Sequence, residues 1–320
     1  HAVSHNYAAY FWDGINVFTQ SLHDPAYGQQ ARAIDFTDND IDLCGDNSIE
    51  TDGGYAHIRV LRNRAFNCTT GALSIQNVYA GPVYLIRNLV WNSGKGVTSL
   101  KNVGAAQVAV MLHNTTSTHH TALRNRTPFS DFVENASWCY QNNLFVGPEG
   151  SAANRRPAAI GSYLSPAGPD RVSNHNGFRP GSGDQLWTVG NERYASREEL
   201  VRGAGYEENS IEVDGYEIFV DVIEPKHDYR DPASVIRFRD VDARLKPGTA
   251  PVDAGTRIPA INDRFRGSAP DLGAYELGAP LPVYGPRTGP YLKQLADLRE
   301  GRYLPVTRPP ETTPRPDSQP

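Results

Sequence analysis

The stretch VLRNRAFNCTTGALSI, residues 60–75, is followed by LIRNLVWNSGKGVTSL, residues 85–100, and the two share one pattern. In each, an apolar run leads into an asparagine, Asn63 or Asn88, and a second apolar run follows. The pattern recurs around six asparagines in all: Asn6, Asn39, Asn63, Asn88, Asn114 and Asn143. From Asn39 onward, successive intervals are 24, 25, 26 and 29 residues. The chain therefore contains a repeat of about 25 residues.

The repeat is built from short β-like runs, such as IRVL, VYLI and VAVML, each placed just before an asparagine. It has no ten-residue amphipathic stretch of the kind that a helical or leucine-rich repeat requires. Asparagine tolerates the left-handed conformation at sharp turns, and equivalent amides can stack from one repeat to the next. We therefore predict strands that pair between repeats, with a ladder of stacked asparagines at one turn.

In its asparagine-marked turns and its period, the chain resembles right-handed parallel β-helix proteins of the pectate-lyase-like superfamily, of the secreted bacterial carbohydrate-active type. The segments VDAGTRIP (252–259) and APDLGAYELG (269–278) look like the ending of many such proteins. The resemblance implies an all-β fold, a single-stranded right-handed parallel β-helix over residues 1–278, with an irregular loop-rich segment at 148–215 on its flank. It also implies a secreted, extracellular or periplasmic protein whose leader precedes His1. Function is implied less specifically, because lyases, hydrolases, esterases, epimerases and adhesins share this scaffold.

Composition limits the partners of this 320-residue chain. Its net charge of −5 gives no general basic field, so nucleic acid and electrostatic membrane binding are poor expectations. No apolar run approaches the eighteen or so residues needed to span a bilayer. A polysaccharide or oligosaccharide is the expected partner.

Three further segments have simple interpretations. The three cysteines show no CxxC spacing, which predicts mostly buried thiols. SREELVRG (196–203) predicts a short helix opened by a capping box from Ser196 to Glu199. Proline recurs through residues 279–320, which predicts an extended tail or linker.

The stretch DNSIETDGG, residues 46–54, concentrates three carboxylates, Asp46, Glu50 and Asp52. Alignment of the repeats predicts one inward-facing row: Ile15, Ile49, Leu73 and Val97. On a strand, side chains two residues apart share a face, so Glu50 and Asp52 are predicted side by side on the exposed face.

Residues around this pair complete a predicted glycan groove. Asp13 and Asp46, at the strand entrances, are candidates for a third catalytic carboxylate. The predicted substrate-binding residues are Asn16, Gln76, Lys101 and the aromatic Trp12, Tyr55 and Tyr79, with Phe18 near the same end. A polar groove with aromatic ends suits sugar rings better than an apolar ligand.

Two chemistries compete for the pair. In glycoside hydrolysis by inversion, two carboxylates about 6.5 to 9.5 Å apart act as acid and base, and residues i and i+2 of a strand fall at the lower edge of this range. This reaction is slightly favoured and needs no cofactor. In the alternative, carboxylates hold Ca²⁺, a hard cation that prefers oxygen ligands, for β-elimination of a uronate polymer.

The elimination alternative has support from the resemblance. Asn16, Glu50 and Asp52 are similar in spacing to the Asn, Glu and Glu that bind calcium in β-helix alginate lyases. The lysine base and the arginine of those enzymes have no direct match, and only His57, Arg59 or Lys101 could replace them. A third alternative is a non-catalytic glycan-binding adhesin.

Overall fold

The computed structural model describes residues 1–17, 31–69, 71–76, 78–93, 100–103, 108–118, 123–126, 137–146, 161–163, 166–179, 187–225 and 232–286. Contacts divide the chain into two compact units, His1–Arg287 and Thr288–Pro320. Everything described below belongs to the first unit, and most of the predicted tail lies outside the described residues.

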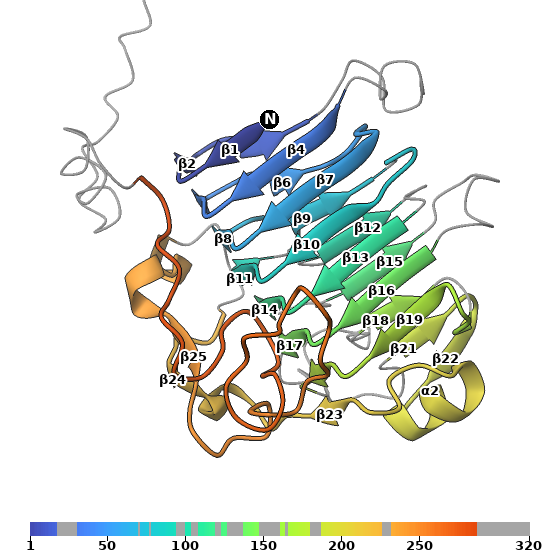
Figure 1. Cartoon of the computed structure of the whole chain (residues 1–320). Helices are drawn as coiled ribbons and strands as arrows, with labels where there is room; N and C mark the ends of the chain where they lie inside the picture. The colour runs from blue at the N-terminus through green and yellow to red at the C-terminus, as the bar shows by residue number, and fades with distance from the viewer. Residues whose placement is uncertain are drawn as a thin grey trace, which may run out of the picture. The chain divides into compact units, whose positions relative to one another are not determined.

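Three parallel sheets make up most of this unit (Figure 1). The first has seven strands: β1 (Ala2–Ser4), β4 (Arg32–Thr37), β7 (Ala56–Leu61), β10 (Val83–Ile86), β13 (Val108–Leu112), β16 (Ser137–Gln141) and β19 (Arg171–Asn174). The second has eight: β2 (Tyr7–Ala9), β5 (Asp40–Asp42), β8 (Arg64–Phe66), β11 (Leu89–Ser93), β14 (Thr115–Thr118), β17 (Leu144–Val146), β20 (Gly177–Phe178) and β23 (Ile211–Glu212). The third has five: β3 (Ile15–Asn16), β6 (Asn47–Glu50), β9 (Gly71–Ile75), β12 (Leu100–Val103) and β15 (Leu123–Arg126).

Two small sheets lie beside these three. One contains β18 (Gly161–Tyr163), β21 (Trp187–Val189) and β22 (Glu192–Tyr194), and the other contains β24 (Phe219–Asp221) and β25 (Asp242–Leu245). Both include an antiparallel pair. The described helices are α2 (Arg197–Ala204) and three 3₁₀ turns, η2 (Tyr216–Ile218), η3 (Pro232–Ser234) and η4 (Phe238–Asp240).

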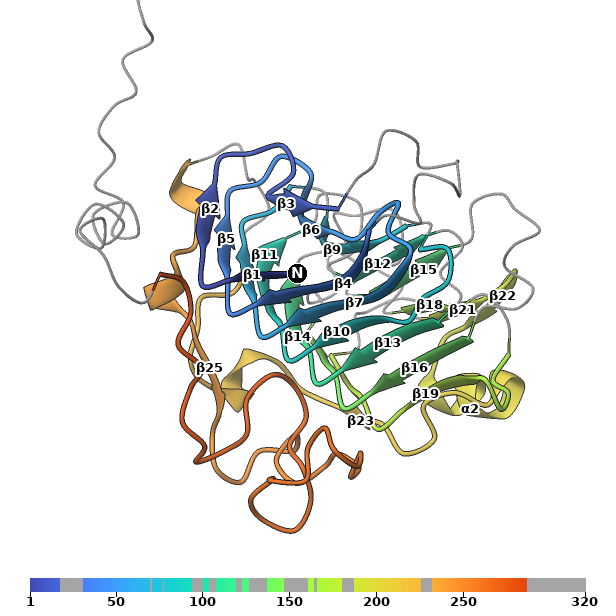
Figure 2. The same ribbon diagram turned by 45° about the horizontal axis from the view of Figure 1, so that its top comes forward.

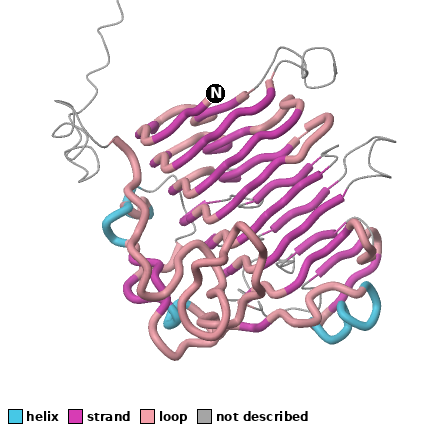
Figure 3. The backbone as a smooth tube through the Cα atoms, in the orientation of Figure 1, coloured by secondary structure: helices cyan, strands magenta, loops and turns pink. Residues whose placement is uncertain are grey.

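This arrangement corrects the predicted fold class. A single right-handed β-helix through residue 278 was expected, whereas the described strands form several parallel sheets with few helices. The repeat ends at β23, and Figure 3 shows that loop dominates the chain beyond β25. The asparagine period indicates which strands pair in parallel, but it carries no information about the small sheets or the loop-rich C-terminal segment.

The core lies between the three large sheets, whose first strands occupy different sides in Figure 2. It takes side chains from all three, such as Phe36, Ile41 and Ile49, each at most 2% exposed. Cys44 and Cys68 are free thiols buried in the same core, and Cys139 is a free, half-buried thiol, as predicted. The alternation of buried and exposed residues along β7 shows the period of two expected for a strand with one covered face.

The predicted asparagine ladder is confirmed and extends one residue further, to Asn176. In each step, a side-chain amide donates to the next asparagine's Oδ1 at 2.8 to 3.0 Å. The left-handed residue, however, precedes each asparagine, with φ of 56° at Asp38, 50° at Arg62 and 55° at Arg87. The asparagine side chain forms hydrogen bonds with the buried backbone groups of that turn. The side chain of the preceding residue takes no part in the ladder.

The predicted helix at 196–203 is confirmed as α2. The Ser196 hydroxyl accepts from the Glu199 backbone N–H at 3.2 Å, and the Glu199 carboxylate accepts from the Ala195 N–H at 2.8 Å. The helix ends at Gly205, whose φ of 75° is the left-handed conformation that glycine adopts without strain.

His113, one of the residues that precede ladder asparagines, is fully buried. Its Nε2 lies 3.1 Å from the Asn142 amide nitrogen and 2.8 Å from that of Asn262, and both contacts need an acceptor at Nε2. Burial, with the neighbouring Arg87 charge as the second cause, lowers the pKa of His113 from 6.5 to about 3. The ring is therefore neutral in the folded chain near neutral pH.

This pKa predicts an acid-sensitive fold. Between pH 6.5 and 3 the unfolded chain binds a proton at His113 and the folded chain does not, so stability from this site is present above pH 6.5 and falls with decreasing pH. At pH 4.5 the loss is about 2 to 3 kcal/mol. Urea unfolding at pH 7 and pH 4.5 measures it, and His113→Gln, which keeps an acceptor oxygen, should reduce the difference by that amount. An unchanged difference in the variant would assign the acid sensitivity to other groups.

Candidate functional site

The five-stranded sheet positions the predicted acidic residues. Its register pairs Ile15 with Ile49, Ile49 with Leu73, and Leu73 with Leu100. The first three members of the predicted inward row are therefore confirmed as neighbours. The fourth is wrong, because Leu100 takes the position assigned to Val97, which lies outside the described residues. Leu100 follows Asn88 by twelve residues, whereas Leu73 follows Asn63 by ten.

Three of the four predicted catalytic carboxylates meet at one end of this sheet. Oxygen atoms of Asp13, Asp46 and Glu50 all lie within 4.8 Å of one another, and each residue is half-buried. Asp13 and Asp46 enter β3 and β6, and the Asp46 N–H donates to the Trp12 carbonyl at 2.7 Å to join the two entrances. Three like charges this close repel one another, and a bound cation would offset that repulsion. We call these three residues the acidic cluster.

Asn47 belongs to the same cluster and was missed by the sequence-based prediction. It is fully buried, and its Nδ2 donates to Glu50 Oε1 at 2.6 Å. The side-chain Oδ1 atoms of Asn47 and Asp46 are buried with no hydrogen-bond partner among the described residues. Asn47 pairs with Gly71, which has no side chain, in the register of the sheet. That pairing is a sequence signal that could have identified Asn47 as a site residue.

This donor set fits a hard divalent cation. Carboxylate and amide oxygens are the ligands that Ca²⁺ prefers, and a cation would also compensate the unpaired buried oxygen of Asp46. Asp13, Asp46 and Glu50 are the residues that would hold it. They differ from the predicted set of Asn16, Glu50 and Asp52, of which only Glu50 is in the cluster.

Asp52 does not share an exposed face with Glu50, so that prediction is wrong. Asp52 is 3% exposed, and its Oδ1 accepts from the Ser74 hydroxyl at 2.7 Å. Strand β6 ends at Glu50, and the chain turns through Gly53, whose φ of 72° is left-handed. The alternation of a strand therefore no longer applies at Asp52.

The aromatic side chains are unevenly exposed. Trp12 is 72% exposed, and the adjacent Tyr10 and Phe11 are 57% and 56% exposed. These three consecutive residues, which we call the aromatic patch, lead directly into Asp13 of the acidic cluster. Exposed aromatic faces of this kind provide stacking surfaces for sugar rings. Tyr10 and Phe11 were not predicted as site residues, although they adjoin Trp12 in the sequence.

The other predicted binding residues lie at various depths. Asn16 is exposed and pairs with Glu50 in the register, and Gln76 is a half-buried residue just after β9. Tyr55 and Tyr79 are half-buried, and the Arg32 guanidinium lies over the Tyr55 ring at 5.2 Å. Phe18 lies outside the described residues.

The basic candidates divide between sheets. His57 and Arg59 are exposed on β7 of the seven-stranded sheet, where Arg59 donates twice to Asp35 at 2.6 Å. Lys101, by contrast, occupies the same sheet as the acidic cluster. The register there continues from Glu50 to Ser74, Lys101 and Arg124 in one row. Arg124 was missed although the signal was present: Leu123 follows Asn114 by nine residues, a spacing close to the ten from Asn63 to Leu73.

Comparisons with protein-family models, curated proteins and solved structures found no match to this chain. Among the described residues, no helix combines the length and apolar character needed to cross a membrane. Function must therefore be argued from the site itself.

Proposed function

We propose that the chain is a secreted enzyme that cleaves glycosidic bonds in a polysaccharide lying across the aromatic patch and the acidic cluster. The observation that carries the proposal is their adjacency: Trp12 is 72% exposed, and the next residue, Asp13, has an oxygen within 4.8 Å of those of Asp46 and Glu50. A stacking platform directly beside reactive carboxylates positions a sugar ring at the group that reacts.

Of the two reactions, cation-assisted β-elimination on a uronate polymer has the better support. Separations within 4.8 Å are shorter than the roughly 6.5 to 9.5 Å of an inverting carboxylate pair. Asp52, the expected second member of that pair, is buried against Ser74. A bound Ca²⁺ would supply neutralisation of the uronate carboxylate, which makes the C5 proton more acidic.

The chain's own residues have separate roles in this proposal. Asp13, Asp46 and Glu50 provide the oxygen ligands, and Trp12 holds the sugar ring. Lys101, in the same register row as Glu50, is our candidate for the base that removes the C5 proton. Lys101 takes the C5 proton, the C4–O bond breaks as the C4=C5 double bond forms, and the leaving oxygen takes a proton from water to become an alcohol.

Glycoside hydrolysis is the second candidate, and the same spacing supports it in a different form. Carboxyl groups about 5 to 5.5 Å apart are typical of retaining enzymes, in which one acts as nucleophile and the other as acid and base. Two members of the acidic cluster, such as Glu50 and Asp46, would take these roles without a cation.

The experiment is incubation with a panel of neutral and uronic polysaccharides, with and without chelator. Elimination gives products that absorb in the ultraviolet, and we expect this signal to disappear with chelator and return with added Ca²⁺. New reducing ends without absorbance, insensitive to chelator, would replace elimination with hydrolysis. Binding of a glycan without either signal would reject the enzyme in favour of a glycan-binding adhesin.

A further inference from the structure

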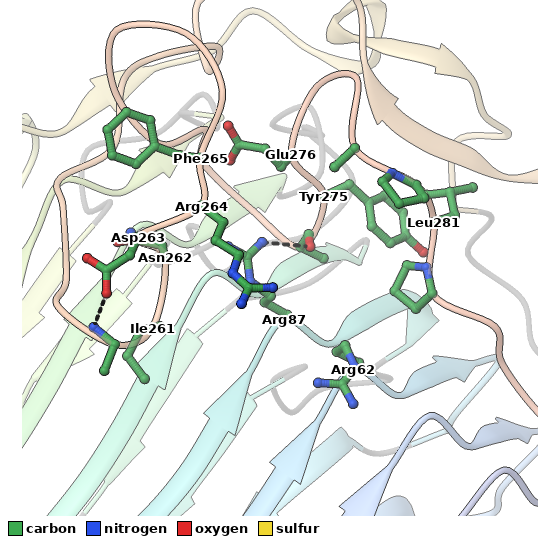
Figure 4. A pocket seen from close by; sticks show the side chains of 15 residues that line it. Arg62, Arg87, Ile261, Asn262, Asp263, Arg264, Phe265, Tyr275, Glu276 and Leu281 are labelled. Atoms are coloured by element: carbon green, nitrogen blue, oxygen red, sulfur yellow. Dashed lines mark hydrogen bonds between the residues drawn. The ribbon is translucent and has the colours of Figure 1, made fainter.

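A cavity of about 590 Å³ is lined by residues from the ends of two strands of the seven-stranded sheet and from the C-terminal loop (Figure 4). One wall is formed by Arg62 and Arg87, which follow β7 and β10 and directly precede ladder asparagines. The other wall is the C-terminal loop 260–282. Leu61 and Ile86 are paired in the sheet, so the repeat places the following residues, Arg62 and Arg87, next to each other. The loop forms the wall opposite them.

The charges around this cavity are not balanced. Arg62 is neutralised by Asp38, to which it donates twice at 2.9 and 3.0 Å. Within the described residues, neither Arg87 nor Arg264, which also lines the cavity, has a carboxylate at ion-pair distance. Two guanidinium groups therefore line the cavity without a carboxylate at ion-pair distance, although the more distant Glu276 and Asp271 charges favour the charged form of Arg87.

The two acidic residues that line the cavity are engaged within the loop itself. Asp263 binds the Arg257 guanidinium at 2.8 Å and accepts from the Ala260 N–H at 2.6 Å. Glu276 accepts from the backbone N–H groups of Arg266 and Asp271 at 2.8 and 3.2 Å. These contacts hold the loop in shape and leave the arginines to a ligand.

Arg87 has fewer hydrogen-bond partners than Arg62. It is half-buried, and its Nη1 donates to the Ala274 carbonyl at 3.3 Å, a long contact for five available donors. Burial lowers the pKa of Arg87; the Glu276 charge opposes this shift, and the Arg62 charge adds to it. Removing a guanidinium from water without pairing it is costly, and a bound oxyanion relieves that cost through charge-assisted hydrogen bonds.

We propose that this cavity binds a small organic anion, with its carboxylate or other oxyanion held between Arg87 and Arg264. The body of the ligand would contact apolar lining residues such as Phe265, Tyr275 and Leu281. A volume of about 590 Å³ lies within the range of small-molecule sites and suits a ligand of one or two sugar rings. An acidic sugar combines this size with the required charge. The site is independent of the acidic cluster.

The test is calorimetric titration of the full chain with glucuronate, inorganic phosphate and glucose at low ionic strength. We expect glucuronate to bind and glucose not to bind. Phosphate binding without glucuronate binding would still support the oxyanion site and would identify a phosphate rather than a carboxylate as its ligand. Loss of one charge-assisted contact should weaken binding about 10- to 100-fold in Arg87→Gln and in Arg264→Gln.

Two further variants complete the design. Arg264 is exposed, so Arg264→Gln keeps the test decisive even if Arg87→Gln does not fold. Arg244→Gln, in β25 and paired with Asp242 outside the cavity, is the matched control and should bind as the wild type does. The proposal is overturned if neither anion binds, or if both Arg264→Gln and Arg244→Gln retain wild-type affinity.

Discussion

Replacing Asn88 by alanine should destabilise the folded chain by about 4 kcal/mol, from the loss of four hydrogen bonds in a buried site. The Asn88 Oδ1 accepts from the backbone N–H and the side-chain amide of Asn63 at 2.9 and 3.0 Å. Its Nδ2 donates to the Val60 carbonyl and to Asn114 Oδ1, both at 2.9 Å. The remaining groups are fully buried and have no access to water, so they stay unpaired in the variant.

Urea unfolding measures this effect, and Asn6→Ala is the matched control. Asn6 begins the ladder, is exposed, and its amide donates to Ser4 and Asn39. We expect its loss to cost about 1 kcal/mol because water can replace its partners. Equal costs at the two positions would mean that the ladder adds little beyond ordinary strand pairing.

Glu50→Gln should reduce glycan cleavage by about 10²- to 10⁴-fold, the usual contribution of a positioned acid, base or ligand carboxylate. Its fold should persist, because a glutamine oxygen can still accept the hydrogen bond that Asn47 donates at 2.6 Å. Initial rates on the best substrate of the polysaccharide panel measure the loss, with thermal unfolding as the check on folding.

The control for this variant is Glu192→Gln, an exposed glutamate in β22 outside the acidic cluster. It should retain full activity. A folded Glu50→Gln protein with wild-type rates would remove the acidic cluster from the reaction.

Local features of the fold were predictable where a residue type forms the same hydrogen bonds wherever the feature occurs. The ladder asparagines satisfy the same turn in every repeat, so their spacing reports which strands pair. The Ser196 capping box similarly marked the start of α2. The fold class was wrong because the segments after β23 lack the repeat, and the antiparallel pair of β24 and β25 depends on contacts that no local pattern encodes.

The candidate site was predictable in part for a related reason. Asp13, Asp46 and Glu50 belong to neighbouring repeats, so alignment of the repeats brings them together. Asp52 was misplaced because Gly53 turns the chain immediately after β6. The cavity beside Arg87 could not be predicted at all, since its opposite wall comes from a segment far along the chain.

The contact between His113 and Asn262 has a consequence for the order of folding. It joins residues 149 positions apart, whereas neighbouring ladder asparagines are separated by 24 to 33. Closing a longer loop costs more chain entropy and requires its docking surface to exist beforehand. The sheets should therefore assemble first and the C-terminal segment should dock last, so that Arg264 reaches the cavity beside Arg87 only in the final folding step.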